Sequence, residues 1–311
     1  MAMSTQRTDR VQVLVVGLTV SLSTARSMPI GHWCGTDTAP VLCADYIEGL
    51  DHSVRNAPHI NGIYSDGAGY TRTTMKRIRK VLERATPEGR ARPLVDFHSG
   101  NNFAFTHAEE VDDCAFSPLW AYADSLWVGE SYNYHSNDAD YWLIRMSGLN
   151  FGIFADMLGE DTFVNPWRGM VFGQTSRAPQ AHPQPMWALW DSFGIEGSDM
   201  IGWWQPEAPV RIVAANGSAA VGLYATSYVI PSKRTLVAVA SWANETAEFK
   251  LDVDWAVLRL DHAKVTQISA PSIVGMQNVS SWTWAQTISV APEQGVLLVL
   301  EPTGDKIADL V

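Results

Sequence analysis

A strand-and-helix unit recurs along the middle of the chain. Short apolar runs end at a carboxylate or a Gly, and most are followed by apolar residues at helical spacing. The strand ends fall near residues 66, 96, 130, 156 and 203, at intervals of 30, 34, 26 and 47 residues. Units of this size build parallel sheets, and eight of them in about 250 residues close a β/α barrel. The sequence predicts five such units.

The lead before these units is short for a complete barrel. Residues 43–57 resemble the helix that precedes the strand at 60–66, and only 59 residues precede Ile60, whereas three further units would need roughly 90. The run "VQVLVVGLTV" at 11–20 leaves two alternatives open: a buried strand, or the apolar core of a weak secretory signal. Secretion would also suit the three N-x-S/T sequons. Either the barrel is incomplete in this chain or the sheet is closed some other way. We expect fewer than eight barrel strands, with the strands at 60–66 and 199–204 lacking their usual neighbours.

The pattern changes near residue 207. Short β-branched runs follow, divided by Pro, Gly, Asn and Asp, and no helix between them is long enough for a crossover. This pattern is typical of an antiparallel sandwich. The expected fold is a partial TIM-type β/α barrel followed by an antiparallel β-sandwich. The expected segments are an atypical lead (1–39), the barrel (40–206), the sandwich (207–302) and a tail (303–311).

Charge and cysteine content exclude several function classes. The formal charge of −11 disfavours nucleic acid, since there is no basic stripe to bind the phosphates. Three Cys without a C-x-x-C motif or a His cluster predict no zinc site, and we expect no metal or other cofactor. The N-terminal apolar run is too short to span a membrane. Thirteen Trp and nine Tyr would fill cores or stack against sugar rings, so a carbohydrate is the expected partner.

Carboxylates gather where the predicted strands end. In a β/α barrel these ends form the rim of the active site. Asp66, Asp96, Glu130 and Asp156 lie there, and Gly67 lets the chain turn beside Asp66. Glycoside hydrolysis uses two such groups, one to protonate the leaving oxygen and one to attack or stabilise the sugar cation. A strand-end Asp can also cap the next helix, which explains Asp96 or Asp156 at least as well.

Further side chains near the predicted rim could bind a sugar. Amide and imidazole donors follow one strand, a pair of Tyr follows Glu130, and a Trp-Arg pair lies in the long irregular stretch from 159 to 183. Two Trp close the last predicted strand, where core packing is the alternative for at least one. The candidate substrate-binding residues are His98, Asn101, Asn102, Tyr132, Tyr134, Asp156, Trp167, Arg168, Trp203 and Trp204.

Several motifs resemble a bacterial group of glycoside hydrolases similar to family 123. They include "GIYSDGAGYTRTTMKRIRKVL", "VDFHSGNNF", "LWVGESYNY", "NPWRGMVFGQTSR" and "GVLLVLE", and the resemblance covers roughly residues 40 to 302. It implies a catalytic β/α barrel, a C-terminal β-sandwich and activity on glycosides.

The chain departs from the characterised enzymes of that family at one position. Those enzymes act on β-linked N-acetylgalactosamine with an adjacent Asp-Glu pair, and here Asp66 is followed by Gly67. Barrel hydrolases of the α-galactosidase type are similar in placing a nucleophile after strand four and an acid after strand six. This analogy implies Asp66 as nucleophile or stabiliser and Glu130 as acid/base, facing one pocket with Tyr132, His98 and Trp203 or Trp204. The alternative is a non-catalytic carbohydrate-binding protein or a truncated remnant.

Overall fold

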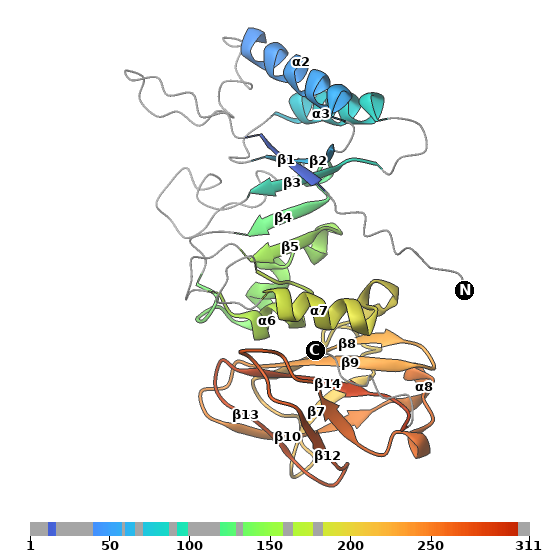
Figure 1. Ribbon diagram of the computed structural model, residues 1–311. Coiled ribbons are helices and arrows are strands. Elements are labelled where there is room, and N and C mark those ends of the chain that lie inside the picture. The colour runs from blue at the N-terminus through green and yellow to red at the C-terminus, as the bar shows by residue number, and fades with distance from the viewer. Residues whose placement is uncertain are drawn as a thin grey trace, which may run out of the picture. The chain divides into compact units, whose positions relative to one another are not determined.

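The computed structural model describes nine stretches of the chain (Figure 1). Two compact units make up the chain, and each is described by itself. The first comprises Met1–Ser131 and Phe151–Phe154, and the second comprises Tyr132–Asn150 and Ala155–Val311. The described stretches are 12–16, 40–57, 60–65, 71–86, 92–98, 119–128, 133–157, 164–176 and 183–303.

A parallel sheet of five strands follows the order of the sequence. Neighbouring strands from the first to the fourth pair in parallel, and Figure 1 shows the strands side by side in the blue to green part of the chain. This sequential order is that of a β/α barrel, and it includes four of the five strands predicted from the repeat, those at 60–66, 92–98, 124–130 and 150–158. The strands are β1 (Gln12–Val16), β2 (Ile60–Ser65), β3 (Leu94–His98), β4 (Ser125–Val128) and β5 (Phe154–Met157).

The helices of the first unit form where the apolar spacing predicts them. α2 spans Pro40–Asn56 and packs on α3, which spans Arg72–Ala85. The apolar side of α3 is buried and includes Met75 and Ile78. Thr71 caps α3, because its side chain accepts a hydrogen bond from the Thr74 amide at 3.2 Å.

Two expectations about the edges of the sheet are wrong. β1 pairs in parallel with β2, so the strand at 60–65 has neighbours on both sides. The expected last parallel strand forms β6 (Asp199–Ile201), which instead pairs antiparallel with β8 (Leu223–Ile230). Beyond β5 the parallel arrangement continues only as a single bridge between Met157 and Ser176 among the described residues.

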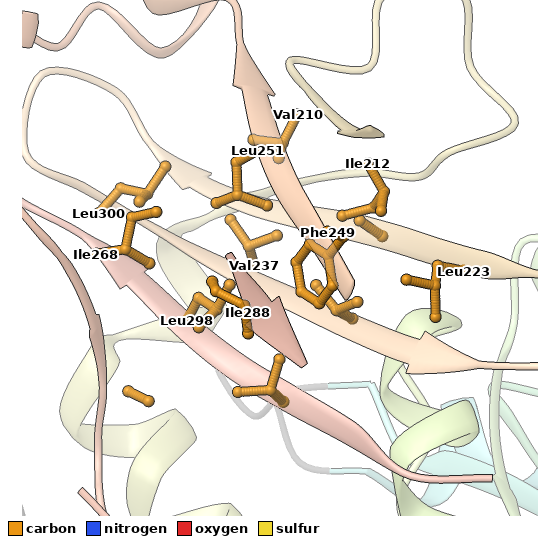
Figure 2. Close-up of a cluster of buried hydrophobic side chains, with 14 of the residues drawn as sticks. Val210, Ile212, Leu223, Val237, Phe249, Leu251, Ile268, Ile288, Leu298 and Leu300 are labelled. Atoms are coloured by element: carbon orange, nitrogen blue, oxygen red, sulfur yellow. The ribbon is translucent and has the colours of Figure 1, made fainter. Parts of the chain in front are cut away.

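The strands from β7 onward form an antiparallel sandwich, as the sequence predicts for residues 207–302, and β6 joins one of its sheets. One sheet has the order β13-β10-β7 and the other β12-β11-β14-β9-β8-β6, and all of their pairings are antiparallel. Figure 2 shows the core between them, where Val237 and Leu298 of one sheet lie near Phe249 and Ile288 of the other. The remaining bounds are β7 (Val210–Ala214), β9 (Arg234–Ser241), β10 (Ala247–Val253), β11 (Ile268–Ala270), β12 (Ser280–Trp282), β13 (Ile288–Val290) and β14 (Gly295–Leu300).

Short helices lie between β4 and β6 and between the strands of the sandwich. The two that bear on the site are α6 (Pro166–Val171) and α7 (Pro183–Phe193). Among the described residues, no helix is long and apolar enough to cross a membrane. The others are α5 (Ala139–Tyr141), η1 (Trp142–Met146), η2 (Leu149–Phe151), η4 (Ile195–Gly197), α8 (Trp255–Leu258) and η5 (His262–Lys264).

Two glycines of the first unit give a matched test of the β2–β3 register. A Cβ at Gly62 would lie 2.5 Å from the Leu94 carbonyl oxygen, whereas a Cβ at Gly49 in α2 meets nothing within 4 Å. Gly62→Ala should therefore lower the free energy of unfolding by about 1–3 kcal/mol. Gly49→Ala should raise it by up to about 1 kcal/mol, because Ala favours a helix. Urea unfolding of both variants measures the difference, and equal midpoints would show that the register is wrong.

Candidate active site

One face of the parallel sheet is polar and aromatic. The strand register aligns Tyr64, Asp96 and Ser125 across β2, β3 and β4. Two residues nearer the carboxyl ends of β3 and β4, it aligns His98 with Trp127. Because alternate residues of a strand share a face, these positions lie together. The opposite face carries buried apolar side chains that include Ile63, Val95 and Phe97. We call Tyr64, Asp96, Ser125 and Trp127 the polar face.

Contacts between side chains hold the polar face in place. The Ser125 hydroxyl donates to Asp96 Oδ1 at 2.7 Å, and Asp96 is only 6% exposed. The rings of Tyr64 and Trp127 lie 5.1 Å apart between centroids, tilted by 58°. Asp96 therefore lies within a strand and is buried and hydrogen-bonded.

At the amino ends of the strands, opposite the predicted rim, an ion pair between Arg79 and Asp124 holds the sheet. Arg79 of α3 donates to the Pro93 and Tyr122 carbonyls and to Asp124, and Asp124 also accepts from the Val95 amide. Burial lowers the pKa of Arg79, an effect that Asp124 opposes. These bonds join α3 to the amino ends of β3 and β4.

A hydrogen-bonded chain lies at the end of β5 in the second unit. Asp156 is half-buried, and its Oδ1 accepts from the Thr175 hydroxyl at 3.0 Å. The Thr175 oxygen in turn accepts from Trp187 Nε1 of α7 at 3.1 Å. Trp187 is 39% exposed. Asp156 thus binds Thr175, and α6, the next helix in the described part of the chain, is capped by Asn165.

Trp167 and Arg168 pack into the second unit, although the sequence predicts that they bind substrate. Their side chains are 6% and 3% exposed. Arg168 donates to the backbone carbonyls of Tyr134, His135 and Ser241, and its guanidinium lies 4.7 Å from the centre of the Trp242 ring. Trp167 Nε1 donates to Gln294 at 3.1 Å. These bonds join α6 to β9 and to the turn before β14, so the contacts of both side chains are structural.

The described aromatic candidates also belong to a packed cluster in the second unit. Tyr134 is fully buried against Trp142, so it does not form the stacking wall that we expected. Trp203 and Trp204 are half-buried and follow β6 in the antiparallel sheet. Trp203 contacts Tyr224 with 4.4 Å between ring centroids, and Trp204 stacks on Phe172 at 5.7 Å.

The predicted catalytic pair lies just past the described strands. β2 ends at Ser65, directly before Asp66, and β4 ends at Val128, two residues before Glu130. The separation of the two carboxyls and the pocket that they share therefore stay predictions. Five predicted residues and one side chain lie outside the described residues, namely Asp66, Asn101, Asn102, Glu130, Tyr132 and the side chain of His98.

Sequence reasoning missed some of these side chains. Tyr64 and Trp127 were absorbed into apolar strand runs, although the alternation of a strand places Tyr64 on the same face as Asp96. No pattern in the sequence around Thr175 or Trp187 indicated that these residues belong to a site. In the described part of the chain, no three His, Cys, Asp or Glu side chains gather in a group that could hold a metal ion.

A parallel sheet in sequential strand order, followed by an antiparallel sandwich, is the architecture of a β/α barrel with a C-terminal β domain. Residues 39–179 match the TIM-barrel domain of glycoside hydrolase 123, and residues 182–301 match the C-terminal domain of glycoside hydrolase 123. Because both domains are matched in order over most of its length, the chain belongs to the glycoside hydrolase 123 family. A comparison with curated proteins gave no match.

Solved structures of similar shape include two bacterial enzymes. One is a GH27 β-L-arabinopyranosidase from Geobacillus stearothermophilus, with 10% sequence identity and a TM-score of 0.48 over 87% of this chain and 63% of that one. Another is an α-amylase from Anoxybacillus, with 9% identity and a TM-score of 0.48 over 86% of this chain and 64% of that one. The chain thus spans less than two thirds of the length of either enzyme.

Proposed function

We propose that the protein hydrolyses a glycoside, with Asp66 and Glu130 as its two catalytic carboxylates. The observation that carries the proposal is the sheet order, in which β2 and β4 flank β3 and all three are parallel. The carboxyl ends of parallel strands meet at one edge of a sheet. Asp66 directly follows β2, and Glu130 comes two residues after the end of β4, so both could serve one site.

The helix after β2 supports a role for Asp66 other than capping. A strand-end Asp often caps the next helix, but Thr71 fills that position in α3. Asp66 also lies two residues after Tyr64, and the alternation of an extended strand would place it on the polar face. A catalytic role is thus a better explanation of this carboxylate than a cap.

The proposed mechanism gives the two carboxylates different roles. Glu130 would protonate the leaving oxygen, while Asp66 would attack or stabilise the positive charge on the sugar. Since Gly67 stands where the characterised enzymes have Glu, we propose that catalysis does not depend on an acetamido group of the substrate.

A non-catalytic carbohydrate-binding protein is the second candidate. The observation that favours it is Gly67, because the family's adjacent acid is missing. A panel of 4-nitrophenyl glycosides, with calorimetric binding of the same sugars measured beside it, separates the two. Release of 4-nitrophenol by the wild-type protein supports the enzyme. Saturable binding without release would support the second candidate and refute the first.

A further inference from the structure

We propose that Asp156, Thr175 and Trp187 form a subsite that binds a single pyranose ring. The geometry points to this because a carboxylate and an exposed indole are joined through one hydroxyl. All three residues belong to the second unit. The proposal rests on the carbohydrate substrate of the proposed function, and it does not depend on the catalytic step.

The hydrogen bonds run from Trp187 through Thr175 to Asp156, so the side chains at both ends of this chain are held in place. The Trp187 N–H donates to the Thr175 oxygen at 3.1 Å, and the Thr175 hydroxyl donates to Asp156 Oδ1 at 3.0 Å. Thr175 is 6% exposed, so this link lies inside the protein. A carboxylate can accept from several donors at once. Asp156 can thus accept sugar hydroxyls while Thr175 holds it in position.

The exposure of Trp187 is not explained by the packing of its helix. α7 buries Met186, Leu189 and Phe193, each at 2% exposure or less, whereas Trp187 is 39% exposed. Thr175 satisfies the indole N–H, so the surface that Trp187 presents to solvent is mostly apolar ring. An anchored ring of this kind offers a flat contact surface that loses little conformational entropy on binding.

The pairing of these groups matches the chemistry of a pyranose. A galactopyranose ring presents its C–H groups at C3, C4 and C5 on one side, which can stack on an indole, while its hydroxyls point outward. Asp156 lies at the end of β5, and Thr175 directly precedes the bridge residue Ser176. Ligand sites in β/α folds lie at these strand ends. A ring-shaped sugar should therefore bind better than an open-chain polyol with the same hydroxyls.

Calorimetric titration of the full chain tests the subsite. Galactose, glucose and arabinose are the probes, and galactitol is the open-chain control for galactose. We expect at least one pyranose to bind saturably and galactitol to bind at least about tenfold more weakly, which corresponds to about 1.4 kcal/mol. Trp187→Ala should weaken the pyranose by a similar factor, and Asp156→Asn should also weaken it.

Conservative variants separate a binding role from a folding role. Thr175→Val breaks the chain of hydrogen bonds and should weaken binding, whereas Thr175→Ser keeps the hydroxyl and should restore it. Trp187→Phe keeps a ring but loses the N–H, so it should lie between wild type and Trp187→Ala. Trp282→Phe, at the edge strand β12, is the matched control and should change nothing.

Three outcomes would overturn the subsite. They are no saturable binding of any probe by the wild-type protein, equal binding of galactose and galactitol, and unchanged affinity in Trp187→Ala and Trp187→Phe. Each is distinct from failure of the proposed function, because the titration measures binding without turnover. A protein that binds galactose through Trp187 but hydrolyses nothing would keep this proposal and lose the catalytic one.

Discussion

Glu130→Gln is expected to lower kcat/KM by about 10³-fold on glycosides with poor leaving groups, because the variant cannot donate a proton to the leaving oxygen. Activated aryl glycosides should lose much less, since nitrophenolate leaves without protonation. The difference between the two substrate types identifies Glu130 as the acid. Steady-state rates on an alkyl and a 4-nitrophenyl glycoside of the same sugar provide the measurement.

Asp66→Asn should slow both substrate types to a similar extent, because a nucleophile or charge stabiliser acts on every leaving group. Glu248→Gln is the matched control, since Glu248 is an exposed acid of β10. It should retain wild-type rates. If Asp66→Asn kept full activity on the aryl substrate, Asp66 would not be the second carboxylate and its role after β2 would be structural.

Arg168→Met is expected to cost about 3–5 kcal/mol in the free energy of unfolding. The change removes the donors that satisfy the carbonyls of Tyr134, His135 and Ser241, and the cation that packs on Trp242. Burial lowers the pKa of Arg168, opposed by the charge of Glu293. The protein therefore holds a buried guanidinium mainly by hydrogen bonds to backbone.

Thermal unfolding of Arg168→Met beside Arg211→Met measures this effect. Arg211 is an exposed residue of β7, so its replacement should change the melting temperature little. A Lys at position 168 should also destabilise, because an ammonium group does not present the planar fork of donors. If Arg168→Met melted at the same temperature as Arg211→Met, the packing role assigned to Arg168 would be wrong.

Local patterns were sufficient to predict most elements of the fold. Helical spacing located α2 and α3, and apolar runs located β2 to β5 and the strands of the sandwich, because these signals depend on neighbours in sequence. The pairing of β6 depends instead on a partner more than twenty residues further along the chain. "DMIGWW" contains no information on strand direction, so its antiparallel pairing could not be predicted.

The site was less predictable because exposure is a tertiary property. Arg and Trp in "NPWRGM" are typical both of sugar contacts and of buried anchors, and only the carbonyls around Arg168 distinguish the two. Trp187 lies in an apolar helical pattern that predicts burial, yet its ring reaches Thr175 and remains exposed. By contrast, Tyr64 and Asp96 follow from strand alternation once the register is known.

The most direct test of the central claim is proton NMR of a glycoside incubated with the purified chain. The anomeric signal reports both the cleavage and the configuration of the released sugar. We predict that the wild-type protein releases free sugar and that the Asp66→Asn/Glu130→Gln double variant does not. Equal release by the double variant, or no release by the wild type from any glycoside of the panel, would contradict the assignment of a two-carboxylate glycosidase.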